Sequence, residues 1–217
     1  MKYIIILFLL TLLNCEWDGI DISEIHGPDV DFDKVKADLK NFVILRAGIG
    51  NSTDIYFELN YKKAKEAGMN VGVYWYSKAL TETESKIEAQ LCLNATSGKK
   101  LEYPIFYDIE QKEILAKGKT FCSAIAFTFC SIMESNQKFC GIYSSKIYFD
   151  AYFTDKVKKK LAIWVAQYNT RCTYMGKYYM WKNSKKGNVN GINGNVDLDI
   201  SFRDFPSIMK TNHLNGY

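Results

Sequence analysis

Hydrophobic residues recur along the chain in short runs that are separated by polar or amphipathic stretches. Eight of these runs have the length and the β-branched or aromatic content that are typical of strands. They cover residues 18–23, 42–48, 70–77, 103–110, 140–145, 161–168, 178–184 and 195–201. The pattern therefore predicts a protein built on eight short strands.

The first five gaps between these strands are predicted to be helices. Residues 81–98, for example, open with a Thr-x-x-Glu capping box at Thr81 and Glu84. The run KVKKK at 156–160 is interpreted as the solvated end of the fifth helix. The last two gaps are short and polar, so strands six to eight are expected to follow one another without helices. The predicted helices cover residues 31–40, 56–68, 81–98, 119–136 and 148–160.

Alternating strands and helices favour a parallel sheet. Eight such strands favour a closed barrel made of five β/α units and three plainer strands. The predicted fold class is therefore α/β, a modified TIM-like β/α barrel with eight strands and about five helices. In such a barrel the last strand closes beside the first.

The fourth strand, YPIFYDIE, carries two acids at its end. Side chains alternate along a strand, so Phe106, Asp108 and Glu110 share one face, and that face is expected to point into the barrel. Asp21 lies near the end of the first strand, and Asp197 lies in the last. The carboxyl end of a β/α barrel holds its active site. The sequence therefore predicts that four acids converge there.

Clustered carboxylates have three interpretations. They bind a metal such as magnesium or calcium, they hydrolyse a glycosidic bond, or they cap backbone amides. Glycoside hydrolysis needs one carboxylic acid with a raised pKa and a second group that assists at the anomeric carbon. Two neighbouring acids supply the first requirement, since like charges raise the pKa of one member. Asp108 and Glu110 together favour the glycosidase interpretation.

The amino-terminal residues resemble a secretory signal. Lys2 is followed by a largely apolar stretch of eleven residues, 3–13, which is too short to span a bilayer. We expect residues 1–15 to be removed and residues 16–217 to form one catalytic domain in a secreted protein or in the lumen of a lysosome or vacuole. No other segment is long and apolar enough to cross a membrane.

Charge and cysteine content narrow the class further. The formal net charge is +4, or +3 without Lys2, which is too mild to indicate nucleic acid as a partner. Two histidines and no CxxC motif make a zinc site unsupported. Of six cysteines, five would remain after cleavage near Cys15, and secretion favours two disulfides and one free thiol. We expect a monomer.

Several segments, read in order, resemble one known family. They are GIDIS, FVILRAGIG, AKEAGMNVGVYWYS, LEYPIFYDIE, LAIWVAQYN and GINGNVDLDI. Together they resemble a glycoside hydrolase family 25 lysozyme, the Chalaropsis-type muramidase, over residues 17–205. The resemblance implies an eight-stranded, five-helix barrel that cleaves the β-1,4 bond between N-acetylmuramic acid and N-acetylglucosamine in bacterial peptidoglycan, with no cofactor and no metal.

The resemblance also implies roles for the four acids. Glu110 matches the general acid, and Asp108 matches the partner that orients and polarises the substrate's N-acetyl group. Asp21 and Asp197 match two further acids of the site that position water or tune Glu110. The family is described as retaining, with the acetamido oxygen of the substrate as a possible nucleophile.

One motif departs from the family pattern. After Trp181 the family usually has Gln-Tyr, whereas this chain has Lys182 and Asn183. The spacing from Trp181 to Asp197 is kept, which indicates substitution rather than misalignment. The change predicts altered substrate preference or weak activity.

Other residues are candidates for substrate binding. Tyr74 and Tyr76 share a face of the third strand, where lining a groove and packing in the core are equally open. Gln167 either binds an acetamido group or satisfies a loop, and Arg46 is expected to form a structural ion pair. The predicted substrate-binding residues are Tyr74, Tyr76, Trp164, Gln167, Tyr168 and Trp181.

The sequence thus leads to a secreted muramidase that degrades bacterial cell walls for defence or feeding. Two alternatives remain open at this point. One is a catalytically silent carbohydrate-binding protein on the same barrel, suggested by Lys182 and Asn183. The other is a glycosidase that acts on chitin-like polymers.

Overall fold

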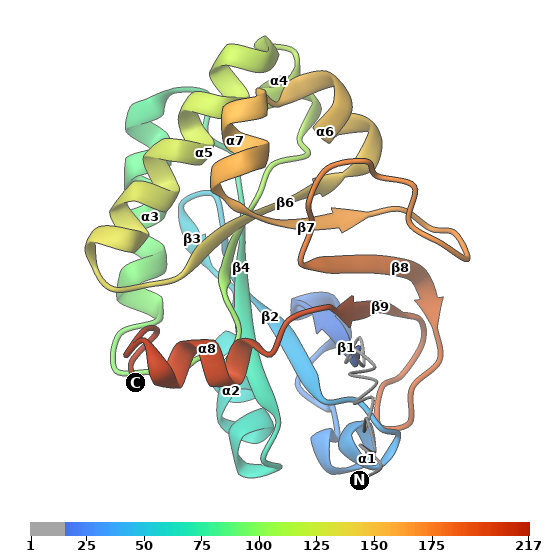
Figure 1. Ribbon diagram of the computed structural model, residues 1–217. Coiled ribbons are helices and arrows are strands. Elements are labelled where there is room, and N and C mark those ends of the chain that lie inside the picture. Colours follow the sequence, from blue (N-terminus) through green and yellow to red (C-terminus); the bar gives the residue numbers. More distant parts are fainter. Residues whose placement is uncertain (1–15) are drawn as a thin grey trace, which may run out of the picture.

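The computed structural model of this chain describes residues 16–217, and their centre is a closed barrel (Figure 1). The predicted signal, residues 1–15, lies outside the described residues. Eight strands close the ring in the order β1-β9-β8-β7-β6-β5-β4-β2, and β2 pairs with β1. These strands are β1 (Trp17–Ile22), β2 (Phe42–Ile49), β4 (Asn70–Tyr76), β5 (Ile105–Asp108), β6 (Cys140–Ser145), β7 (Ala162–Ala166), β8 (Met180–Gly187) and β9 (Val196–Ser201).

All eight predicted strands are present, and the last pairs with the first as expected. A ninth strand, β3 (Ser52–Thr53), was not predicted and extends β2 outside the ring. The ring is not fully parallel, because β9 runs antiparallel to both β1 and β8. No helix separates β8 from β9, and a short connection can join only antiparallel neighbours.

The helices outnumber the five that were predicted. The fifth predicted helix is two helices, because Phe153 and Thr154 between them are extended. The two others that were missed are short: α4 has four residues and α8 has seven, too few to give a clear period of 3.6 residues. The α-helices are α1 (Phe32–Ala37), α2 (Phe57–Glu66), α3 (Glu82–Ala95), α4 (Lys112–Leu115), α5 (Gly118–Ser135), α6 (Lys146–Tyr152), α7 (Asp155–Lys160) and α8 (Phe205–Thr211), and η1 (Glu24–His26) is a 3-10 turn.

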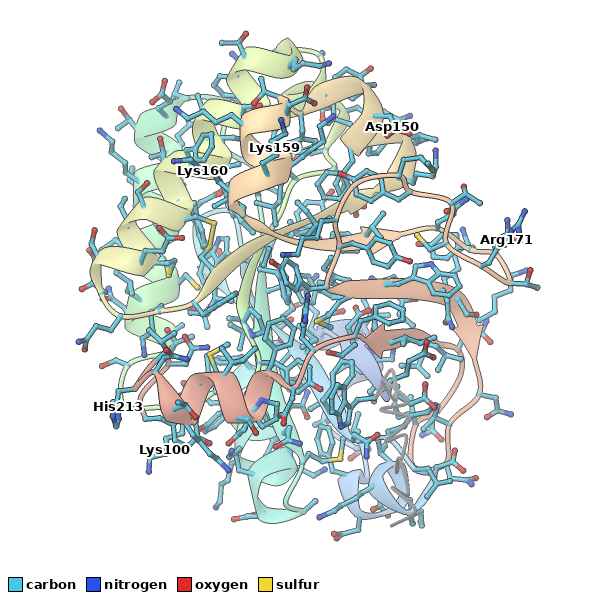
Figure 2. The ribbon with its side chains drawn as sticks, viewed as in Figure 1. Lys100, Asp150, Lys159, Lys160, Arg171 and His213 are labelled. Carbon is cyan, nitrogen blue, oxygen red and sulfur yellow. A yellow bond between two sulfur atoms is a disulfide. The ribbon has the colours of Figure 1, made fainter. Side chains whose placement is uncertain are left out.

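Local signals in the sequence fix the helix ends. The backbone N–H of Glu84 donates to Thr81 Oγ1, and the N–H of Thr81 donates to the Glu84 carboxylate, so the predicted capping box begins α3. Lys159 and Lys160 point outward at the end of α7 (Figure 2). The interpretation of KVKKK as a solvated helix end is therefore confirmed.

The barrel separates two hydrophobic cores. Ile105, Tyr107 and Ile109 face outward into the core beneath the helices. Phe106 faces inward, where it joins the rings of Phe42 and Trp164. The inner core closes at the end where the parallel strands begin, because α8 inserts two side chains there, Phe205 and Met209. The other end is left open for polar groups.

The cysteines are paired differently from the prediction. Cys130 in the C-terminal half of α5 and Cys140 at the start of β6 form a disulfide with a Cα–Cα distance of 5.2 Å. Cys92 and Cys122 are buried in the outer core, and neither they nor Cys172 form a disulfide within the described part of the chain. Residues 16–217 therefore contain one disulfide and three free thiols instead of two disulfides and one thiol. Within the same residues, no helix combines the length and the apolarity of a membrane span.

Asn215 ties the segment after α8 to the strand starts. Its side chain is fully buried; Nδ2 donates to the Tyr103 carbonyl at 2.9 Å, and Oδ1 accepts from the Phe139 N–H at 2.8 Å. Asn215 also has a positive φ of 56°, which Asn tolerates better than other residues with a Cβ.

Replacing Asn215 with Ala is expected to lower the free energy of unfolding by about 2–3 kcal/mol, because two buried backbone groups lose their partners. Urea denaturation measures the loss. Asn212→Ala is the control: its exposed side chain bonds only to the Ile208 carbonyl, and the expected change is about 0.5 kcal/mol or less. Equal effects of the two substitutions would contradict this account of Asn215.

Candidate active site

A cleft of about 370 Å³ opens at the carboxyl end of the barrel strands. All four predicted acids line it, from three different strands or their ends. Asp108 is the last residue of β5, and Glu110 follows two residues later on the same side. Asp21 on β1 and Asp197 on β9 are direct partners in the strand register. The structure therefore brings together the four acids that the sequence predicted to converge.

Lys182 lies between two of these acids. Its Nζ donates to Asp197 Oδ2 at 2.8 Å and lies 2.9 Å from Asp21 Oδ2. The same ammonium lies 4.5 Å from the ring centre of Tyr143 and 5.1 Å from that of Trp164. The side chain is 6% exposed. The residue that departs from the family motif is thus an internal cation of the acid cluster.

Burial and like charges shift the ionisation of the acid pair. Burial, and then the charge of Glu110, raise the pKa of Asp108 well above its usual value. Burial also raises the pKa of Glu110; the charge of Lys182 opposes this rise, and those of Asp21 and Asp197 add to it. Within residues 16–217, the Glu110 carboxyl has no ion-pair partner. A carboxyl group of this kind keeps its proton to a higher pH than an ordinary glutamate.

A fifth acid, Asp199, lies deeper in the barrel and was missed in the sequence. It is buried beneath the cleft, where Oδ1 accepts a hydrogen bond from Trp164 Nε1 at 2.8 Å. Burial and the charge of Asp21 raise the pKa of Asp199 well above its usual value. Strand alternation could have identified Asp199. It lies two residues after Asp197 on β9 and so shares its face, as Glu110 lies two residues after Asp108 at the end of β5.

Three of the six predicted substrate-binding residues line the cleft: Tyr74, Tyr76 and Tyr168. Tyr74 and Tyr76 extend inward from β4, and half-burial raises the pKa of Tyr76 to about 12. Tyr168 is exposed at the rim after β7. Tyr143 on β6, which was not among the predicted binding residues, also lines the cleft. The walls of the cleft are therefore rich in tyrosine.

The other three predicted binding residues do not line the cleft. Trp164 is 1% exposed and packs in the inner core below the acids. Gln167 holds its own loop: Oε1 accepts from the Thr173 N–H, and Nε2 donates to Thr173 Oγ1. Trp181 faces the outer core, and its Nε1 donates to the Gln167 carbonyl. The structure places Trp164 and Trp181 outside the groove, contrary to the prediction, because Trp164 packs in the inner core and Trp181 points to the other face of β8. For Gln167 it agrees with the second of the two interpretations, a side chain that satisfies a loop.

Arg46 borders the cleft but is engaged elsewhere. Its Nε donates to Asp54 Oδ2 at 2.8 Å, and its Nη2 lies 2.8 Å from Glu24 Oε1. The interpretation of Arg46 as a structural ion pair is confirmed. His26 also borders the cleft, where its Nδ1 accepts from the Ser23 N–H and closes the η1 turn.

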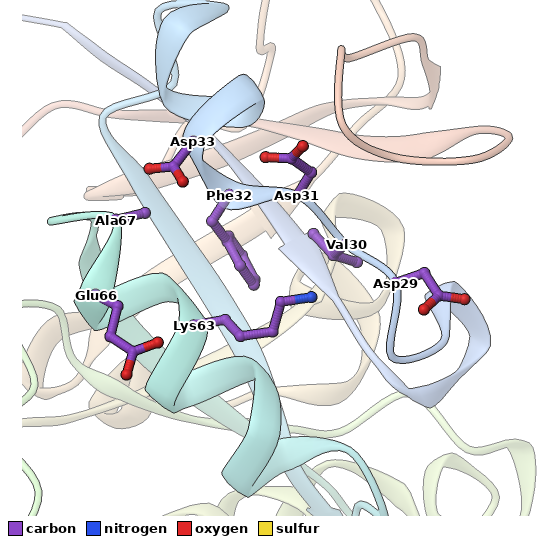
Figure 3. Close-up of a pocket in the computed structure, with 8 residues that line it drawn as sticks. All are labelled: Asp29, Val30, Asp31, Phe32, Asp33, Lys63, Glu66 and Ala67. Carbon is purple, nitrogen blue, oxygen red and sulfur yellow. The ribbon is translucent and has the colours of Figure 1, made fainter.

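A second pocket, of about 490 Å³, lies on the outside of the barrel between α1 and α2 (Figure 3). It contains acids from both sides and Lys63, whose Nζ donates to the Pro28 carbonyl at 2.9 Å. None of the four cleft acids borders it.

Within residues 16–217, no group of three or more His, Cys, Asp or Glu side chains has the arrangement of a metal site. In the cleft, Lys182 supplies the positive charge that carboxylates otherwise draw from a metal ion.

A β/α barrel that carries a pair of acids in a cleft at its carboxyl end has the arrangement that a glycoside hydrolase on this fold needs. Comparison with known proteins agrees: residues 20–192 match the family described as Glycosyl hydrolases family 25. The chain belongs to this family, and the resemblance drawn from the sequence is confirmed.

Similar proteins include an autolytic lysozyme of Clostridium acetobutylicum, which is 30% identical over 187 residues. That match covers 83% of this chain and 54% of the lysozyme, so the chain spans about half the length of that relative. Among solved structures, a similar one is the modular autolysin LytC of Streptococcus pneumoniae in complex with a synthetic peptidoglycan ligand. The TM-score is 0.79 at 25% identity, and the match covers 85% of this chain and 46% of LytC. The CTP1L endolysin gives 0.79 at 25% identity, over 90% of this chain and 70% of that one.

Proposed function

We propose that this chain is a muramidase that hydrolyses the β-1,4 bond between N-acetylmuramic acid and N-acetylglucosamine in bacterial peptidoglycan. The observation that carries the proposal is the pairing of Asp108 with Glu110 in one cleft of a family 25 barrel. The names of the relatives, a lysozyme, an autolysin and an endolysin, support peptidoglycan as the substrate.

Glu110 is proposed as the general acid. Its raised pKa keeps the proton that must pass to the glycosidic oxygen while the bond to the anomeric carbon breaks. The acetamido oxygen of the substrate then bonds to the anomeric carbon, and Asp108 orients and polarises this acetamido group. In the second step, water attacks the same carbon and gives its proton to the Glu110 carboxylate, while the bond between this carbon and the acetamido oxygen breaks and the acetamido group is restored. The anomeric configuration is therefore retained.

Asp21 and Asp197 are proposed to position the attacking water and to tune Glu110. Tyr74, Tyr76 and Tyr168 line the cleft. They are proposed to bind sugar units through their flat rings and hydroxyl groups. A protein that digests cell walls acts outside the cytoplasm, so we also propose that the chain is secreted and that residues 1–15 direct it there. A monomer remains our expectation.

The substrate class is tested by comparing peptidoglycan with chitin oligomers. The purified chain is expected to release new reducing ends from peptidoglycan and few or none from chitin oligomers of matched concentration. Reducing-end assays on both polymers measure the difference. Faster release from chitin would replace the muramidase proposal with the chitinase-like alternative.

One observation keeps a binding protein as the second candidate. Lys182 contacts two of the four acids and reduces the net negative charge of the cluster. A folded chain that sediments with bacterial walls but releases no reducing ends would favour the binding protein over the enzyme.

A further inference from the structure

Lys182 and Arg46 are both buried cations that line the cleft, but only Lys182 of the two is paired with predicted catalytic acids. Lys182 lies on the inner face of β8, between Met180 in the inner core and the cleft above. Desolvation of an ammonium group is costly unless it is paired and hydrogen-bonded. Two carboxylates and two aromatic rings offset that cost here. A neutral side chain of similar length would fill the same space without this cost, so packing alone does not account for the charge.

The partners of Lys182 lie across the barrel from the general acid. Asp21 and Asp197 are on the adjoining strands β1 and β9, and β9 is the direct neighbour of β8. Glu110 follows β5, which is separated from β8 by β6 and β7. The ammonium group therefore neutralises one wall of the cleft and leaves Glu110 without a cation partner on the other.

We propose that Lys182 is a positioning residue of the active site, whose ammonium group is a fixed counter-charge that holds the Asp21 and Asp197 carboxylates together opposite Glu110. The inference rests on the proposed function for its catalytic consequence, and on the contacts alone for its structural one. Without Lys182, like charges in one small cleft would repel one another, and Asp21 and Asp197 would separate or take up protons.

The charged and titratable groups around Lys182 come from the other seven strands of the barrel or from the residues that follow them. The carboxyl groups are Asp21, Asp108, Glu110, Asp197 and Asp199. The other charged or titratable groups are Arg46, Tyr74, Tyr143 and Tyr168. Burial and the charges of Asp21, Tyr143, Asp197 and Asp199 act in opposite directions on the pKa of Lys182, and the charges prevail, so it is raised well above its usual value. Lys182 therefore stays charged while the acids titrate.

The pH profile distinguishes a counter-charge from a packing role. The charge of Lys182 lowers the pKa of Glu110, and the charge of Asp197 raises it. Lys182→Met should therefore move the alkaline limb of kcat/KM on peptidoglycan to higher pH, whereas Asp197→Asn should move it to lower pH. At the optimum of the wild-type chain, Lys182→Met is expected to be about 10- to 100-fold slower because Asp21 and Asp197 lose their placement. Lys186→Met, on the exposed part of the same strand, should leave the profile unchanged.

The proposal would be overturned if the alkaline limbs of Lys182→Met and Asp197→Asn move in the same direction or do not move. A loss of packing alone would not shift the two limbs in opposite directions. If Lys182→Met does not fold, the downward shift in Asp197→Asn and the folding of the double variant Lys182→Met/Asp197→Asn carry the test. The double variant removes one charge of each sign, so it is expected to fold.

Urea unfolding of the single and double variants tests the counter-charge without any activity. Adding Asp197→Asn to Lys182→Met is expected to restore part of the stability that Lys182→Met loses. A wild-type chain that cleaves nothing would refute the proposed function but leave this cycle intact. Purely additive losses in the cycle would refute the counter-charge itself.

Discussion

Glu110→Gln is expected to lower the rate of peptidoglycan hydrolysis by about 10²- to 10⁴-fold, because the variant has no proton to give to the glycosidic oxygen. Glutamine keeps the shape of the side chain. Among the described residues Glu110 makes no ion pair, so the substitution breaks none. The charge of Glu110 raises the pKa of neighbouring Asp108, which means that the two charges repel each other. Removing the charge of Glu110 should therefore not weaken the fold. Clearing of a peptidoglycan suspension measures the rate, and urea denaturation measures the stability.

Glu113→Gln is the matched control for this substitution. Glu113 is exposed on α4, three residues after Glu110 and outside the lining of the cleft. The Glu113→Gln variant should clear peptidoglycan at the rate of the wild-type chain. A Glu110→Gln variant that clears as fast as Glu113→Gln would remove Glu110 from the mechanism.

Asp108→Asn is expected to lower activity by about 10²-fold or more and to raise stability near neutral pH. The carboxyl is 4% exposed, and its Oδ1 is buried without a hydrogen-bond partner among residues 16–217. Activity falls because the acetamido group loses the preorganised carboxyl group that is proposed to orient and polarise it.

The gain in stability follows from the raised pKa of Asp108. When the pKa in the folded state exceeds that in the unfolded state, the folded state binds more protons, so stability falls as the pH rises through this window. Replacing the acid with a neutral amide removes that loss. Urea denaturation at pH 7 and at acidic pH should show a gain for Asp108→Asn only at pH 7, and Asp33→Asn, exposed on α1, should show none. A variant that is both active and less stable would contradict the role given to Asp108.

Much of the site was predictable because alternation along strands is a strong rule. It assigned Phe106, Asp108 and Glu110 to the inner face, and barrel closure brought Asp21 against Asp197. The same rule would have identified Asp199, which was passed over. Loop and helix details were less predictable, because the break at Phe153 depends on a local backbone conformation that no periodicity marks.

Side-chain partners were the least predictable part of the site. The position of Lys182 in the sequence identified a substitution in a motif, but only the closed ring reveals that its ammonium group reaches acids on two other strands. Trp164 and Gln167 were predicted to bind substrate, yet both are engaged within the protein. The prediction of two disulfides was wrong for the same reason, because cysteine pairing depends on distances that a sequence does not contain.

The most direct test of the central claim is the chemical identity of the ends that the purified wild-type chain releases from peptidoglycan. The new reducing ends are reduced with borohydride and identified by mass spectrometry, beside Glu110→Gln. The account predicts N-acetylmuramic acid at the new ends, from the wild-type chain alone. New ends that carry N-acetylglucosamine, or equal release by Glu110→Gln, would contradict it.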